Sequence, residues 1–229
     1  MSKLLSWVRW NRFGAGAIAM LLVFAAPVMA AASLPPASAE AFVQTNVDKG
    51  LAILSNHRIP DDARRQQFRD FLTGLTDIKR IAMFTLGNAR RTASPADVNA
   101  FIDAFRDYAV AVYESRLNQY AGQSLKVTGA TERAPGDFIV TTVLVDPLGQ
   151  AKNQEPIEVD FRVLNDNGHF VVIDASVVGV WLAIEERDQF TAFLAQNDNN
   201  VPALVSHLKE LTTKLRSDED KAAQQPAQH

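Results

Sequence analysis

The residue types that could do chemistry are few and dispersed. The chain has 229 residues, no cysteine and four histidines, namely His57, His169, His207 and His229. Without cysteine it has no thiol nucleophile, disulfide, iron–sulfur cluster or cysteine zinc site. Because a zinc site needs three or four converging ligands, four widely separated histidines do not indicate one. We therefore expect no metal ion and no cofactor.

The charged residues give no clear catalytic group. The strand acids that could act as a general acid or base are Asp174 and Asp160, and alternation puts Asp160 on a polar face. The acidic run 185–188 opens a predicted helix, where negative charge offsets the helix dipole. The pairs Arg64-Arg65 and Arg90-Arg91 suit either an anionic headgroup or solvated helix faces. No metalloprotease, serine hydrolase, Walker A or dinucleotide motif is present, so we expect a protein that is not an enzyme.

The N-terminal segment differs in composition from the rest. Three basic residues and no acidic residue precede position 40, and residues 13–32 are apolar. This layout is typical of a cleaved secretory signal peptide. We predict that residues 1–39 are signal peptide and linker, with cleavage after Ala30 or Ala39. The alternative is an uncleaved membrane anchor, since about 20 apolar residues span a bilayer.

Two hydrophobic periods divide the remainder into helices and strands. A period of 3.6 residues predicts helices over about 40–56, 61–86 with a possible division at Gly74, 95–121, 183–196 and 202–215. A period of two residues predicts four strands at about 123–128, 137–145, 156–164 and 169–174.

Short links join these predicted strands, and residues 165–168 read as a hairpin turn. The fold class is therefore α+β, with an antiparallel four-stranded meander sheet covered by the N-terminal and C-terminal helices. We expect one domain over 40–216 and a disordered tail over 217–229, where apolar residues are scarce. A net charge of −3 argues against nucleic acid as a partner.

Several motifs, weak singly but ordered along the chain, carry a family resemblance. They are Ile78-Lys79-Arg80-Ile81-Ala82 before Leu86-Gly87, Ser94-Pro95 before Phe101 and Phe105, Tyr113-x-x-Arg116-Leu117-x-x-Tyr120-x-Gly122, Val172-Ile173-Asp174, and Gly179-Val180-Trp181-Leu182 before Arg187-x-x-Phe190. Over about residues 40–215 the chain resembles the MlaC family of periplasmic lipid carriers, which includes toluene-tolerance auxiliary proteins and hopanoid-associated relatives. Asn88-Ala89-Arg90-Arg91 and Trp181 depart from the usual family pattern.

The resemblance implies a soluble periplasmic carrier with an apolar cavity between sheet and helices. Such proteins hold phospholipid acyl chains and pass lipid between an outer-membrane lipoprotein complex and an inner-membrane ABC transporter, which maintains outer-membrane lipid asymmetry. The physics agrees, because exposing a sixteen-carbon chain to water costs on the order of 12 kcal/mol. The alternatives are a hopanoid carrier, a periplasmic chaperone or adaptor, and an enzyme on a cone-shaped α+β fold.

Strand alternation and the apolar face of the long helix supply the predicted lipid contacts. In the strand 137–145 it is ambiguous which alternate residues face inward, since Val140 and Leu144 are apolar as well as Val143 and Val145. Trp181 suits either the edge of the cavity mouth or a core anchor. The predicted lipid-binding residues are Phe105, Tyr108, Val112, Leu117, Val127, Val143, Val145, Val159, Phe161, Val163 and Trp181.

Overall fold

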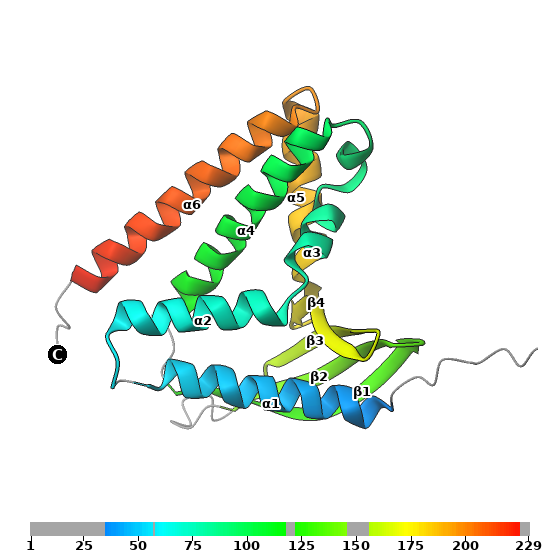
Figure 1. Ribbon diagram of the computed structural model, residues 1–229, viewed down its shortest axis with the longest axis vertical. Helices are drawn as coiled ribbons and strands as arrows, with labels where there is room; N and C mark the ends of the chain where they lie inside the picture. Colours follow the sequence, from blue (N-terminus) through cyan, green and yellow to red (C-terminus); the bar gives the residue numbers. More distant parts are fainter. Residues whose placement is uncertain (1–34, 57, 118–121, 146–155, 225–229) are drawn as a thin grey trace, which may run out of the picture. The chain divides into compact units, whose positions relative to one another are not determined.

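The computed structural model describes residues 35–56, 58–117, 122–145 and 156–224, all within one unit that spans Ser33–His229. Figure 1 shows these helices and strands. In chain order they are α1 (Pro36–Leu54), α2 (Asp61–Leu75), α3 (Ile78–Thr85), the 3-10 helix η1 (Gly87–Arg91), α4 (Pro95–Leu117), β1 (Ser124–Ala134), β2 (Asp137–Val145), β3 (Glu158–Asp166), β4 (His169–Val177), β5 (Val180–Trp181), α5 (Leu182–Gln196) and α6 (Val201–Gln224).

The strands form one antiparallel sheet in the order β1-β2-β3-β4-β5. This meander confirms the α+β fold class, but the sheet has five strands where the sequence predicted four. The additional strand β5 pairs with Ser176 and Val177 of β4. A strand of two residues is too short to show a period of two, so β5 left no signal in the sequence.

The turn between β3 and β4 is the predicted hairpin. Asn167 and Gly168 have φ of 54° and 92°, a backbone region that Asn and Gly tolerate best. The Gly168 amide donates to Asn165 Oδ1 at 2.8 Å. This local chemistry fixes the register of β4 against β3, and with it the face on which each side chain lies.

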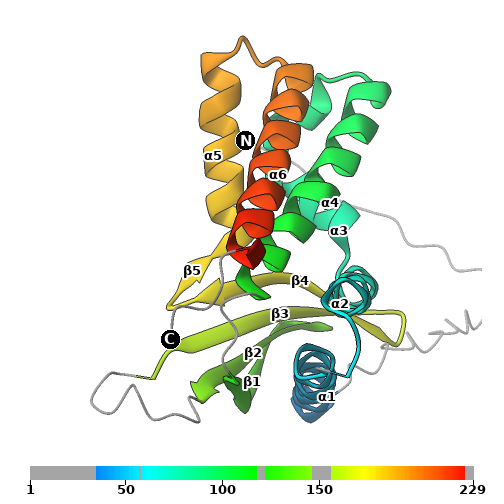
Figure 2. The same ribbon diagram turned by 90° about the vertical axis from the view of Figure 1, so that its left-hand side faces the viewer.

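Strand pairing defines the inner face of the sheet. Val127 lies opposite Thr142, which lies opposite Val159 on the next strand. Toward the other end of β2, Phe138 and Val140 are fully buried. The inner-face core cluster consists of Ala39, Val43, Phe138, Val140, Val163 and Val172. Because two of these residues come from α1, that helix covers the β1 and β2 side of the sheet, as Figure 2 shows.

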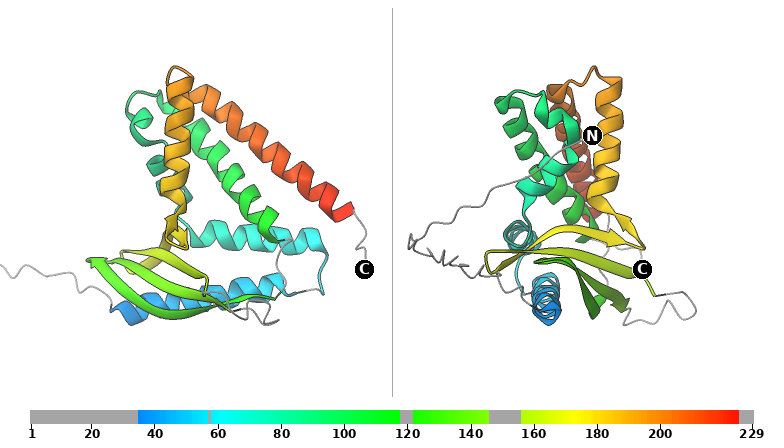
Figure 3. Two further views of the ribbon diagram at one scale, coloured as in Figure 1. Left: turned by 180° about the vertical axis from the view of Figure 1, so that it is seen from behind. Right: turned by 90° about the vertical axis from the view of Figure 1, so that its right-hand side faces the viewer.

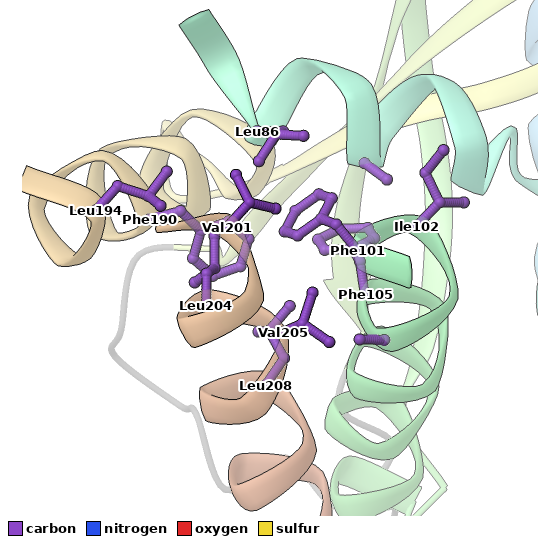
Figure 4. Close-up of a cluster of buried hydrophobic side chains, with 12 residues drawn as sticks. Leu86, Phe101, Ile102, Phe105, Phe190, Leu194, Val201, Leu204, Val205 and Leu208 are labelled. Carbon is purple, nitrogen blue, oxygen red and sulfur yellow. The ribbon is translucent and has the colours of Figure 1, made fainter. Parts of the chain in front are cut away.

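The other helices build a second core. In Figure 4, Phe101 and Phe105 of α4 point toward Phe190 of α5 and toward leucine and valine side chains of α6. The ring centroids of Phe101 and Phe105 lie 5.9 and 6.2 Å from that of Phe190, in edge-on geometry, which such rings prefer. Figure 3 shows α5 continuing from β5, and α6 running away from the far end of α5 alongside α4. The two cores therefore consist of different residues. Helix α2 contributes to the walls of the cavities that are described below.

Helix boundaries differ from the sequence prediction at three places. The helix predicted over 61–86 divides at Thr76 and Asp77 instead of Gly74, because Thr76 is extended and the Asp77 carboxylate accepts the Arg80 amide at 2.9 Å, starting α3. The first helix begins at Pro36, inside the segment assigned to the linker. The last helix continues to Gln224, into the segment predicted to be disordered, because residues 217–224 contain no Gly or Pro to end it.

The predicted signal peptide lies almost wholly outside the described residues, which start at position 35. Among the helices that the structure describes, none is long and apolar enough to cross a membrane.

Candidate functional site

The larger of two adjoining apolar cavities lies between α1, α2 and the inner face of the sheet and has a volume of about 470 Å³. Nearly all of its lining is aliphatic or aromatic. The lining residues are Phe42, Val43, Asn46, Val47, Gly50, Leu51, Leu54, Phe68, Phe71, Leu72, Leu75, Tyr113, Gln123, Ser124, Leu125, Leu144, Val159, Phe161 and Val172. This composition suits the hydrocarbon part of a ligand.

A smaller cavity of about 250 Å³ lies between α2, α4, the start of α5 and strands β3 and β4. It includes Phe105, Tyr108 and Val112 from α4, and Leu182 and Glu186 from α5. Five residues line both cavities, namely Leu72, Leu75, Tyr113, Phe161 and Val172. The two cavities are therefore neighbours that share a wall.

The apolar face of α2 lines both cavities, and its Leu75 also packs against the inner-face core cluster. None of its residues is fully buried, although Phe68, Phe71, Leu72 and Leu75 follow a helical stripe. Gly50 of α1 lets the two helices approach, because a Cβ there would come within 3.1 Å of the Phe71 ring. An apolar helix face that is only partly buried is available to a ligand.

One end of the smaller cavity is polar. The Tyr108 hydroxyl donates to Glu186 Oε1 at 3.1 Å, while Glu186 Oε2 is buried and has no hydrogen-bond partner. Asp174 Oδ1 accepts the amides of Ala175 and Ala183 at 2.8 and 3.0 Å. Burial raises the pKa of Asp174 and that of Glu186 above their ordinary values, because the charged carboxylate loses solvation.

Burial also raises the pKa of Tyr108 and that of Tyr113, and the nearby carboxylates add to both effects. Both phenols therefore stay protonated near neutral pH. The polar end of the smaller cavity thus presents the Tyr108 hydroxyl, already engaged with Glu186, and the carboxyl groups of Asp174, Glu185 and Glu186.

The structure brings together five of the predicted lipid-binding residues. Phe105, Tyr108 and Val112 line the smaller cavity, Val159 lines the larger one, and Phe161 lines both. Their roles as lipid contacts are taken up as a proposal below.

Two more predicted residues, Val127 and Val163, share the inner face without lining either cavity. Val163 is fully buried in the inner-face core cluster, and Val127 packs against that cluster. The side chain of Leu117 falls outside the described residues.

The structure corrects the predicted orientation of three residues. Thr142 and Leu144 face inward, and successive side chains of a strand point to opposite faces. Val143 and Val145 therefore lie on the outer face. Since β2 is apolar on both faces, its pattern did not reveal the parity. Trp181 lines neither apolar cavity; it lines a hollow of about 620 Å³ that also includes Arg80 and Arg162 and that shares Ile81, Asp174 and Ala183 with the smaller cavity.

Sequence reasoning missed the contributions of α1 and α2 to the cavities. Val43, Val47, Leu51 and Leu54 form the stripe that predicted the first helix, and all four line the larger cavity. A stripe that lines a cavity and one that fills a core have the same period, however. The polar pair Tyr108 and Glu186, 78 positions apart, left no sequence signal at all.

The other charged candidates make ordinary structural contacts. Arg64 and Arg65 pair with Asp61 and Asp62 one turn earlier on α2. Asp160 Oδ2 accepts the Ser176 hydroxyl at 3.0 Å, whereas Asp160 Oδ1 is buried without a hydrogen-bond partner among the described residues. Among the described residues, no group of three or more His, Asp or Glu side chains is arranged to hold a metal ion.

These features define an α+β protein with a meander sheet and two adjoining apolar cavities under its helices. The family model described as MlaC protein matches residues 44–210, so the chain belongs to the MlaC family. The fold is also similar to that of a solved structure, a phospholipid-binding protein from Ralstonia solanacearum in complex with a phospholipid. The TM-score is 0.65 and the identity 23%, over 78% of this chain and 98% of that one.

Proposed function

We propose that this chain is a soluble periplasmic carrier that binds the acyl chains of a phospholipid in its two apolar cavities. It passes the lipid between an outer-membrane lipoprotein complex and an inner-membrane ABC transporter. The observation that carries the proposal is the pair of adjoining cavities, whose lining is predominantly apolar apart from the carboxyl groups at one end of the smaller cavity. Membership of the MlaC family and the phospholipid in the similar structure support it.

The energetics of lipid transfer explain why such a cavity is needed. Moving one sixteen-carbon chain into water costs on the order of 12 kcal/mol, and two chains about twice as much. A carrier must replace the bilayer by an apolar interior, and α1, α2 and the inner face of the sheet supply one. We propose Phe105, Tyr108, Val112, Val159 and Phe161 as lipid contacts, because all five line the cavities.

One observation favours a second function. Asp174 and Glu186 line the smaller cavity, and burial raises the pKa of each carboxyl, a combination also found in acid–base enzymes. An enzyme would convert a cavity ligand into a product, whereas a carrier returns it unchanged. Incubation with loaded lipid, followed by mass analysis of the lipid, separates the two functions.

The experiment that tests the carrier is native mass spectrometry of protein purified from the periplasm without detergent, with analysis of the extracted lipid. We expect one two-chain phospholipid per protein. A hopanoid would point to the triterpenoid relatives of the family. Protein that is consistently empty, and that takes no lipid from vesicles, would contradict the carrier proposal.

Two tryptophan variants make this test specific to the cavity. Val159 lines the larger cavity, and Val143 lies on the adjacent strand but on the outer face. We expect Val159→Trp to reduce the lipid content of the purified protein at least fivefold, because the indole fills the space of the acyl chain. The matched control Val143→Trp should keep its lipid. Equal lipid content in the two variants would show that the ligand lies elsewhere.

A further inference from the structure

The segment from the end of β4 to the start of α5 exposes apolar side chains. Of the nine large apolar side chains that are exposed in the described part of the chain, five fall within residues 177–184. Figure 2 shows this segment at the edge of the sheet, where β5 leads into α5. Scattered apolar residues are ordinary on a protein surface, but a contiguous group marks an interaction site. The β5 patch consists of Val177, Val178, Val180, Leu182 and Ile184.

One member of the β5 patch has a strained backbone. The hairpin between β4 and β5 has the two-residue turn Val178-Gly179, with φ of 51° and 79°. Asn-Gly is the preferred pair for such a turn, and a β-branched residue is strained there. Val178 is exposed, so packing within the described part of the chain does not offset the strain. An exposed valine that also strains the backbone points to a contact outside the chain.

The β5 patch continues the walls of both cavities. Val177 lies opposite Val159, which lines the larger cavity, and Val180 lies opposite Val177. Paired residues of neighbouring strands share a face of the sheet, so the cavity face extends outward through these two valines. Leu182, the first residue of α5, lines the smaller cavity. A molecule bound on the β5 patch therefore adjoins residues that line both cavities.

The charges beside the β5 patch restrict what can bind it. The Glu158 carbonyl accepts the Val178 amide at 2.9 Å, so Glu158 adjoins the tip of the patch, and Glu185 follows Ile184 on α5. Both carboxylates are exposed, and neither has an ion-pair partner among the described residues. Residues 175–186 contain no Lys or Arg. The complementary charge on a partner is therefore basic.

Two other occupants fit these charges less well. An anionic bilayer would be repelled by the carboxylates and would find no lysine or arginine in this segment to hold its headgroups. In a symmetric dimer the patch would meet its own copy, so the same carboxylates would face each other. The hollow that includes Trp181 contains three arginines, but two of them are paired with aspartates. A protein of different sequence therefore fits best.

We propose that the β5 patch docks a protein partner, different from this chain, that presents an apolar surface with a basic residue beside it. The inference rests on the proposed carrier function, because a partner in this position covers the edges of both cavities. Lipid then passes from one apolar surface to the next without exposure of its acyl chains to water, which is the costly step of transfer.

Sedimentation with membranes tests the docking. The probes are vesicles of the inner and outer membranes of the bacterium that makes the protein, the same vesicles after protease treatment, and protein-free vesicles of the extracted lipids. We expect the mature protein to sediment with native vesicles of one or both membranes. It should sediment with neither the protease-treated nor the protein-free vesicles.

The double variant Val178→Asn with Val180→Asn removes apolar side chains from the patch without adding charge. We expect it to bind native vesicles at least fivefold more weakly. It should keep its lipid and remain folded, because Asn relieves the strain at position 178. The matched control Val145→Asn replaces an exposed valine on the outer face of the sheet and should bind normally. A purely structural role of the two valines would not give a loss of docking without a loss of stability.

Charge reversal tests the basic residue of the partner. We expect Glu158→Lys to weaken binding to native vesicles severalfold, and more strongly at low salt, because surface charges are screened less there. The control Glu210→Lys reverses an exposed charge on α6 and should bind like the unaltered protein.

Five results would overturn this inference alone. Equal binding to protein-free vesicles would make the bilayer the occupant, and a dimer that the double variant abolishes would make the occupant a second copy. The others are no binding to native vesicles, undiminished binding of the double variant, and undiminished binding of Glu158→Lys. Protein that carries no lipid and takes none from vesicles would instead contradict the carrier proposal, whatever its binding to membranes. The failures of the two proposals are therefore distinguishable.

Discussion

The Arg69 guanidinium of α2 donates to the buried Glu114 carboxylate of α4, with Nε 2.9 Å from Oε1. Glu114 is only 3% exposed, whereas its partner is 38% exposed. This pair joins α2 to α4, one of the helices of the second core. Because no residue of α2 is fully buried, the pair holds in place a helix that forms a wall of both cavities.

Removing Arg69 should loosen this wall. We expect Arg69→Ala to lower the free energy of unfolding by about 2 kcal/mol, because Glu114 is left buried without its charged partner. Urea unfolding measures the loss, and hydrogen exchange should rise most in α2. Arg65→Ala breaks an exposed pair on the same helix and should change stability by less than about 0.5 kcal/mol. Similar losses for the two variants would show that the buried pair has no special role.

The pH dependence of stability should report the buried carboxyl of Asp174. Its pKa is raised above 3.8 in the folded protein, so the folded state holds the proton more tightly than the unfolded state. The resulting stabilisation is complete below pH 3.8 and is lost as the pH rises through the raised pKa. Asp174→Asn keeps the acceptor for Ala175 and Ala183, so it should be more stable than the unaltered protein at pH 7.

Urea unfolding at pH 7 and at pH 3.5 measures this difference, which should shrink at the lower pH. The control Asp107→Asn removes an exposed charge from α4 and should follow the unaltered protein at both pH values. An Asp174→Asn variant that is less stable at pH 7 would mean that the charged carboxylate stabilises the fold.

The turn between β4 and β5 contains a strained valine. Val178 has φ of 51° and is 69% exposed. A left-handed backbone costs a β-branched residue roughly 1–2 kcal/mol, and Asn tolerates it better. We expect Val178→Asn to raise the free energy of unfolding by about 1 kcal/mol, seen as a higher Tm. The control Val180→Asn replaces an exposed valine whose backbone has ordinary strand geometry. It should not raise the Tm.

The start of α1 allows a choice between the two cleavage positions. Ala39 is fully buried in the inner-face core cluster, and α1 begins at Pro36. Cleavage after Ala39 would remove this buried side chain and the first helical turn. We therefore propose cleavage after Ala30, which N-terminal sequencing of the exported protein would check. Protein that starts at Glu40 should be less stable by about 1–2 kcal/mol than protein that starts at Ala31.

The sequence predicted the elements with long periodic patterns. The strand 156–164 alternates cleanly, so its inner face was predicted correctly, and Val159, Phe161 and Val163 all lie there. The hairpin turn at Asn167-Gly168 was predicted for the same kind of local reason, since positive φ favours these residue types. Local chemistry was sufficient in both cases.

Where a hydrophobic pattern is compatible with several three-dimensional arrangements, the sequence alone did not predict which arrangement forms. The strand β2 is apolar on both faces, and only its pairing with Val127 and Val159 shows that Thr142 faces inward. Likewise, the stripe of α2 would be the same if the helix were packed against a core. The polar end of the smaller cavity depends on a hydrogen bond between Tyr108 and Glu186, which are 78 positions apart in the sequence. Only the tertiary structure brings these two residues together.

The order of the elements along the chain has a consequence for folding. The sheet is a meander of successive strands, so each pairing closes only a short loop, but α1 packs against residues of β2 about a hundred positions later. A chain that emerges with its N-terminus first presents Ala39, Val43 and the rest of that helix face to water before β2 exists. Contacts between distant segments form slowly, and apolar surface that waits for its partner is prone to aggregation. The first helix of the fold is therefore among the last to be secured, and its apolar face needs protection while the sheet is being completed.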